Sequence, residues 1–340
     1  MTRLVYSEAE MLAEHPYARP QIEAGYQLHG GFDAAGTYIS PRTLLRWPAV
    51  KAGQAALVER GFPLIDASTR LLQRETYPNF AQQKLLLDLG LGETLWNGLT
   101  ITGFVEARGR RLAELAAPDF QPLVEEPIAG TAIGHLGKGL LKAHGFDEGG
   151  SPERGECGHD TMWFAVRDLL FGADAYPLPE VPPALARPEL GRLIPQVSLP
   201  HEQIILMLMN VLMIEIRAEK FFAFCTRIMR APELFRERRA AEHAAVLVER
   251  IRQDEAIHVA YLQTAVSELR SFTFLAATGA RVPGKSFIDP IWEGMVRWHS
   301  STTLDHARSQ TRDAIAERLL AAPAGAARLA HFDALEQEAA

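Results

Sequence analysis

Glu255 and His258 are the residues of this 340-residue sequence whose types and spacing point most directly to chemistry. A spacing of three places both side chains on one face of a helix. The other residues on that face are apolar: Ala244, Leu247, Val248, Ile251, Val259, Leu262 and Val266. An ionised carboxylate in an apolar stripe is costly unless it is paired or bound to a metal. The pattern therefore predicts that Glu255 and His258 bind metal; a buried Glu–His pair without metal is the alternative.

The preceding apolar segment contains two further carboxylates, Glu215 and Glu219. Their helical phase points away from the polar strip of the same segment, which is formed by Asn210, Arg217, Lys220 and Arg227. In an antiparallel hairpin they would meet the face that carries Glu255 and His258. Because the two glutamates are four residues apart, either or both can face a metal. In the alternative interpretation, one of them only pairs with a basic residue of its own helix.

These residues together resemble the ferritin-like di-iron carboxylate superfamily, which includes ribonucleotide reductase small subunits, acyl-carrier-protein desaturases, bacterial multicomponent monooxygenases and arylamine N-oxygenases. That superfamily places a Glu or Asp on one helix and E-x-x-H on the next, and repeats this arrangement on a second hairpin. The second hairpin matches through Glu215 or Glu219, followed by Asp254, Glu255 and His258. The resemblance covers about residues 90–275 as a pattern. It implies a helical bundle that holds a two-metal site.

The first hairpin departs from this pattern. Glu106 is its best single carboxylate, because small residues share its face. His135 lies on the next predicted helix, but the residue three positions earlier is Ala132 instead of a glutamate. The literal E-x-x-H spelling occurs at Glu156 and His159, where neighbouring glycines disfavour a regular helix. We favour Glu156 and His159 because they complete the carboxylate count, and His135 stays open as the alternative.

Carboxylates with two imidazoles suit iron, or else manganese, whereas a structural zinc site would favour cysteines. The resemblance implies a dinuclear iron centre that activates O2 and oxidises an apolar or amine-bearing small molecule, with an electron-donor protein as a partner. A homodimer is a further expectation. Two other functions stay open: a ferroxidase or metal-storage protein, and a non-enzymatic helical scaffold with a degenerate metal site.

Helical periods dominate the chain, so the expected fold class is all-α: a ferritin-like four-helix bundle core with additional N- and C-terminal helices. Within one compact domain, residues 1–78 are expected to form short helices and loops packed on the bundle. Residues 79–275 are expected to form the metal-binding bundle, and residues 276–340 a helical extension.

The principal helices are expected near residues 49–60, 63–74, 79–116, 127–144, 201–230 and 233–275. The helix that ends at His144 has Gly145 as its expected cap. A loop should then run to Asp160, which is placed to cap the next short helix.

Composition argues against several other classes of protein. The net charge of −7 is spread along the chain without a basic stripe, which argues against a nucleic-acid partner. No apolar run approaches the ~20 residues of a membrane span. The two cysteines, Cys157 and Cys225, are expected to be free thiols in a reducing compartment. We therefore expect a cytoplasmic protein that is not bound to a membrane.

Overall fold

The computed structural model describes residues 5–72, 76–181, 191–276 and 279–337. These residues are mostly helical, as expected for the all-α class. The α-helices are α1 (Glu8–Met11), α2 (Arg46–Glu59), α3 (Phe80–Asp88), α4 (Glu93–Gly109), α5 (Leu140–Gly149), α6 (His159–Phe171), α7 (Leu199–Arg230), α8 (Arg238–Ser271), α9 (Lys285–Ser300), α10 (Thr302–Ala321) and α11 (Gly325–Gln337). Short strands form three antiparallel two-stranded hairpins: β1 (Gln21–Glu23) with β2 (Tyr26–Leu28), β3 (Gly31–Phe32) with β4 (Tyr38–Ile39), and β5 (Thr273–Leu275) with β6 (Arg281–Pro283).

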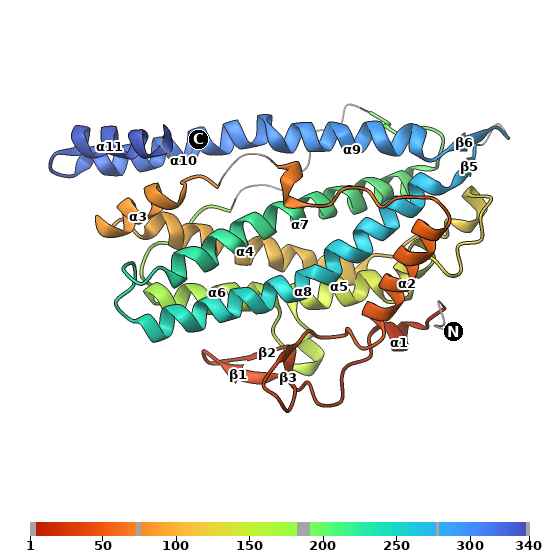
Figure 1. Cartoon of the computed structure of the whole chain (residues 1–340), viewed down its shortest axis with the longest axis horizontal. Helices are drawn as coiled ribbons and strands as arrows, with labels where there is room; N and C mark the ends of the chain where they lie inside the picture. The colour runs from red at the N-terminus through yellow and green to blue at the C-terminus, as the bar shows by residue number, and fades with distance from the viewer. Residues whose placement is uncertain (1–4, 73–75, 182–190, 277–278, 338–340) are drawn as a thin grey trace.

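The central feature is a bundle in which α4, α7, α8 and the pair α5–α6 lie side by side (Figure 1). The two longest helices, α7 and α8, form an antiparallel hairpin, because Pro232 follows α7 directly and ends it. The α6 helix packs on both α4 and α8. Buried apolar residues from these helices, among them Leu99, Trp163, Phe222 and Leu247, form one core between them. This core fixes which face of each helix points into the bundle.

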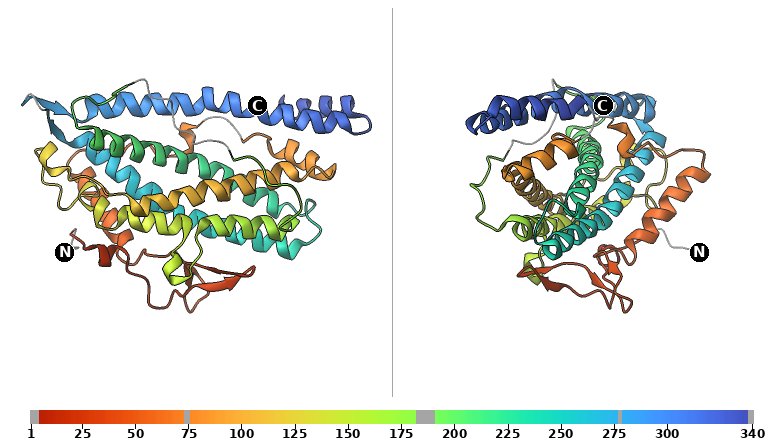
Figure 2. Two further views of the ribbon diagram at one scale, coloured as in Figure 1. Left: turned by 180° about the vertical axis from the view of Figure 1, so that it is seen from behind. Right: turned by 60° about the vertical axis from the view of Figure 1, so that its left-hand side comes forward.

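The helices α5 and α6 lie end to end on one side of the bundle, with residues 150–158 leaving the line between them (Figures 1 and 2). Gly150 leaves α5 with a positive φ of 74°, which favours glycine. Gly158 then returns the chain so closely that a Cβ there would lie 2.4 Å from the Gly150 nitrogen and 2.6 Å from the Asp147 carbonyl oxygen. Backbone hydrogen bonds between Ser151 and Glu156 close the excursion. The end of α5 and the start of α6 are therefore in direct contact.

The two ends of the chain pack on opposite sides of this bundle (Figure 2). On one side, the N-terminal segment carries β1–β4 and leads to α2, which packs on α8. On the other side, α9 packs on α7 and α8, and the α10–α11 hairpin continues from it to α3. None of the helices within the described ranges combines the length and apolarity of a membrane span.

Several local predictions were wrong. The N-terminal segment contains β-hairpins in addition to its short helix, and residues 63–68 are not helical. The helix expected over residues 127–144 is instead a short 3-10 segment (Ile133–Lys138) followed by α5. Gly145 lies inside α5 instead of capping a helix. Glycine is required there by close packing, because a Cβ would clash with the backbone of Ala113. Asp160 lies in the first turn of α6, whose N-cap is Gly158.

The close contact at Gly158 generates a stability prediction. Gly158→Ala would place a methyl group against backbone atoms of residues 147–150, which cannot move as a flexible side chain can. We expect it to lower the free energy of unfolding by about 3 kcal/mol. The measurement is the midpoint of urea-induced unfolding.

Gly53→Ala in α2 is the matched control for Gly158→Ala. Its new Cβ would meet only the Thr264 methyl group at 3.5 Å, an ordinary contact. The control should be neutral or more stable by up to about 1 kcal/mol, because alanine favours a helix. Equal midpoints for Gly158→Ala and the parent would contradict the proposed close joint.

Candidate metal centre

Among the described residues, two overlapping groups of buried ligand residues lie inside the bundle, and a third group, His29, His159 and Asp254, adjoins them; in each group the ligand atoms are within 4.8 Å of one another. The first group is Glu106, Glu148, His159 and Glu255. The second is His144, Glu148, Glu215 and His258. These residues come from α4, α5, α6, α7 and α8, so every helix of the bundle contributes to one cluster.

Glu255 connects the two groups. Its Oε1 atom lies 2.9 Å from His159 Nδ1, and its Oε2 atom lies 2.7 Å from His258 Nδ1. Glu255 and His258 share a face of α8 because they are one helical turn apart, whereas His159 reaches Glu255 from α6. Each oxygen of this carboxylate therefore faces a different imidazole, as a carboxylate between two metal ions does.

Glu148 lies opposite Glu255 and also faces both groups. Its Oε1 atom is 3.1 Å from His144 Nε2, 3.3 Å from His258 Nδ1 and 3.9 Å from His159 Nδ1. His144 lies one turn earlier on α5, and its Nε2 is also 3.2 Å from Glu215 Oε1. The contact between the ends of α5 and α6 places Glu148 beside His159, although eleven positions separate them in the sequence.

Two of these histidines each have a buried aspartate next to Nε2, the ring nitrogen that points away from the central glutamates. Asp254 Oδ2 lies 3.2 Å from His159 Nε2, and Asp147 Oδ2 lies 3.0 Å from His258 Nε2. Each aspartate directly precedes a central glutamate and supports a histidine of the other helix pair, so the arrangement is reciprocal. A carboxylate that accepts a hydrogen bond from Nε2 leaves Nδ1 free to bind a metal.

The N-terminal segment completes the surroundings of both aspartates. Arg42 and Arg46 donate to Asp147, with Arg46 Nη2 at 2.7 Å from Oδ2. His29 Nε2 is 3.1 Å from Asp254 Oδ2, and the Tyr38 hydroxyl donates to the same oxygen at 2.9 Å. Burial would raise the pKa of Asp147, but Arg42 and Arg46 outweigh burial and hold it well below its usual range. Asp147 is therefore an anion beside His258.

The central carboxylates repel one another in the absence of a bound cation. Burial raises the pKa of Glu148 and Glu215 well above the usual value for glutamate, and neighbouring carboxylates raise it further. Burial also raises the pKa of Glu106. For Glu255, His258 and His159 outweigh burial and hold the pKa well below its ordinary value. Full ionisation of the cluster therefore requires added positive charge.

The donor set could hold a metal ion. His159 Nδ1 and Glu255 Oε1 are 2.9 Å apart, yet both are buried without a hydrogen-bond partner among the described residues. Two donor atoms at this separation can coordinate the same metal ion. Oxygen and imidazole donors without thiolate suit iron or manganese. The residues of the two groups would hold the metal, and Glu148 and Glu255 each contact histidines of both groups.

The structure brings together five of the residues predicted from the sequence: Glu106, His159, Glu215, Glu255 and His258. Glu156 lies outside both groups, and its carboxylate is 2.8 Å from Arg154 Nη2. His135, the alternative, lies elsewhere: its Nδ1 is 2.7 Å from the Thr131 carbonyl oxygen, and its Nε2 accepts from the Tyr6 amide. Glu219 also lies outside the groups, because it pairs with Arg252.

Sequence reasoning missed Glu148 and His144. The segment around Glu148 was predicted as a loop, and His144 as the end of a helix. Two signals were present in the sequence. The dipeptide Asp147-Glu148 repeats Asp254-Glu255, and His144 stands four residues before Glu148, which is a ligand spacing on a helix. Neither signal has the spelling E-x-x-H. Residues 150–158 separate Glu148 from His159 in the sequence, so the two are not three residues apart on one helix.

Comparisons of the chain with protein-family models, with curated proteins and with solved structures found no match. The functional argument therefore rests on the geometry of the buried cluster.

The central ligands generate a prediction about metal content. Glu148→Ala and His258→Ala each remove a donor, so we expect protein purified from metal-supplemented medium to lose at least one of two metal ions per chain. Elemental analysis of folded protein measures this. Glu156→Gln is the matched control, since its carboxylate lies outside the cluster, and it should retain the parent's metal content. Unchanged metal in both cluster variants would contradict the site.

The reciprocal aspartates generate a second prediction. Asp254→Asn keeps the shape of the side chain but weakens the hydrogen bond that orients His159. We expect metal affinity to fall by about 10–100-fold, as is typical when a histidine's outer partner is altered. Competition with a chelator measures the affinity. An affinity equal to the parent's would show that Asp254 does not orient the ligand.

Proposed function

We propose that this protein is an O2-activating non-haem di-iron oxygenase or oxidase with a ferritin-like bundle, acting on a small molecule. The observation that carries the proposal is the buried set of four glutamates and three histidines from every bundle helix. Its carboxylate count equals the charge of two divalent ions, and a carboxylate-rich set stabilises the higher oxidation states of iron. Manganese is the alternative metal for the same donors.

When held by these residues, a pair of Fe(II) ions would supply two of the four electrons that reduce O2; the oxidised substrate would supply the other two, and an electron-donor protein would return the iron to Fe(II). The chain's own residues hold the donors in place and exclude water. Asp147 and Asp254 orient the imidazoles, while the Tyr261 hydroxyl, 2.7 Å from His144 Nδ1, does so for the third histidine. Trp163 and Tyr261 are fully buried, so they help to keep the bundle dry around the cluster.

Two observations favour this function over the other two expectations. A degenerate scaffold was inferred from the missing glutamate at Ala132, but Glu148 provides the carboxylate beside His159. A ferroxidase needs no site for an organic substrate, whereas a cavity of about 1060 Å³ is lined by Glu215 and Glu255. A cavity of this size is typical of a small-molecule site.

The experiment is to load metal-free protein with Fe(II) under anaerobic conditions, add O2, and follow oxygen consumption with near-ultraviolet absorption. We expect about two iron ions per chain, and O2 consumption that develops diferric absorption and continues when a chemical reductant is supplied. Glu148→Gln should lower the rate of O2 consumption by at least tenfold, on the order of the loss for an altered metal ligand. A protein that binds no iron, or binds iron and consumes no O2, would contradict the proposal.

A further inference from the structure

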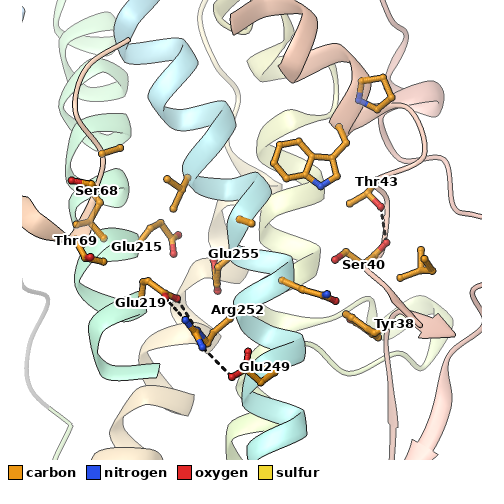
Figure 3. A pocket seen from close by; sticks show the side chains of 18 of the residues that line it. Tyr38, Ser40, Thr43, Ser68, Thr69, Glu215, Glu219, Glu249, Arg252 and Glu255 are labelled. Carbon is orange, nitrogen blue, oxygen red and sulfur yellow. Dashed lines mark hydrogen bonds and ion pairs between the residues drawn. The ribbon is translucent and has the colours of Figure 1, made fainter. Parts of the chain in front are cut away.

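The cavity that contains Glu215 and Glu255 lies between the α7–α8 hairpin and the N-terminal segment (Figure 3). Glu215 on α7 and Glu255 on α8 form its inner end, and one helical turn away Arg252 lies between Glu219 and Glu249 (Figure 3). Residues 38–40, 43, 44, 47 and 48 line the cavity on the α8 side, and residues 67–69 line it on the α7 side (Figure 3). A molecule in this cavity would therefore contact both the cluster and the N-terminal segment.

The charges on the cavity wall disfavour an anionic ligand. Arg252 is the single lysine or arginine among the described lining residues, against the four carboxylates of Glu215, Glu219, Glu249 and Glu255. Two of these carboxylates belong to the metal cluster. The other two carboxylates outnumber Arg252 on the cavity wall, and Glu249 also pairs with Arg230, which lies outside the lining residues.

Arg252 is not free to bind a ligand carboxylate. Its Nε donates to Glu219 Oε2 at 3.0 Å, its Nη2 donates to the second oxygen of the same carboxylate, and its Nη1 donates to Glu249 Oε1 at 3.0 Å. These contacts hold the guanidinium in a fork of two carboxylates. Both glutamates remain partly exposed, with side-chain exposures of 35% and 38%. Glu249 Oε1 also accepts from Arg230 Nη1 at 3.4 Å, so a ligand cation would meet the second oxygen of Glu249 and the exposed lone pairs of Glu219.

The rest of the wall consists of apolar side chains, hydroxyl groups, the Gln253 amide and the His15 imidazole. Trp47, Leu44 and Val259 provide apolar surface, while Ser40 and Thr43 provide hydroxyls. Lys51 Nζ lies 4.9 Å from the centre of the Trp47 ring, but this lysine is exposed to solvent, which screens its charge. The cavity thus combines an acidic outer ring with an apolar body.

We propose that this cavity is the substrate site of the di-iron centre and that its substrate is an amphipathic amine that is cationic at neutral pH. Arg252 occupies the space between Glu219 and Glu249, so the ammonium group lies on the exposed side of these two carboxylates, and the apolar part of the molecule lies against Trp47 and Leu44. This assignment rests on the proposed function for its chemistry, but the binding of the amine is a property of the cavity itself. Since Glu219 is one turn from Glu215, the carbons near the nitrogen lie closest to the cluster, about 6 Å along the helix axis.

Three probes with the same chain and different head groups test the charge selection: n-octylammonium, 1-octanol and octanoate. Their affinities are measured by calorimetry on metal-free protein and on protein loaded with Mn(II), which separates recognition by the wall from direct binding to metal. We expect octylammonium to bind at least about tenfold more tightly than the other two probes in both forms. An octanoate affinity equal to or above that of octylammonium would overturn the assignment, as would no measurable binding of any probe.

Variants then locate the selecting groups. Glu219→Gln together with Glu249→Gln leaves Arg252 without its two carboxylates, so the preference should reverse towards octanoate. Glu293→Gln on α9 is the matched control: this exposed carboxylate pairs with Arg297 outside the cavity, and its loss should leave the preference unchanged. Trp47→Ala should weaken octylammonium and octanol alike. An unchanged preference in the double variant would refute the role of the acidic ring.

The outcomes also separate this inference from the proposed function. Metal-free protein that selects octylammonium, in a chain that takes up no iron, supports the cavity assignment and contradicts the di-iron proposal. A chain that takes up iron and consumes O2 but shows no selection for octylammonium overturns the cavity assignment alone.

Discussion

The structure is organised around the cost of bringing four glutamates together inside a helical core. An ionised carboxylate removed from water loses several kcal/mol of solvation free energy, and its neighbours add repulsion when they are also anions. Glu106, Glu148, Glu215 and Glu255 are each no more than 9% exposed. Arg42 and Arg46 pair with Asp147, so their positive charge does not offset the charge of these glutamates. His159 and His258 offset the charge of Glu255, so only full ionisation of Glu106, Glu148 and Glu215 as well would require positive charge beyond these histidines.

The reciprocal support of the histidines ties the two helix pairs into one unit. Asp147 lies on α5 and orients His258 on α8, while Asp254 lies on α8 and orients His159 on α6. Displacement of either helix would therefore disturb a ligand on the other. The same hydrogen bonds assign the nitrogen of each imidazole that faces the centre, so packing and ligand chemistry depend on the same contacts.

The N-terminal segment has two roles in this arrangement. Its arginines and Tyr38 stabilise the aspartates behind the ligands, and Tyr38 together with Trp47 also lines the cavity on the α7–α8 side. One segment thus connects the outer surroundings of the metal ligands with the surface that would contact a substrate. It is part of the functional unit, although it lies outside the bundle.

The sequence alone determined those features that depend on unbroken helical phase. The apolar stripe around Glu255 and His258, and the inward phase of Glu106 and Glu215, follow from 3.6 residues per turn along a continuous helix, and the structure places all four in one cluster. Only the tertiary structure decided the partner of His159. Helical phase does not extend across residues 150–158, so sequence spacing favoured Glu156, whereas the contact of Gly158 with the end of α5 supplies Glu148. Tertiary packing likewise decided that Glu219 pairs with Arg252 across the hairpin, because a helical phase shows which way a side chain points and not which residue of another helix it meets.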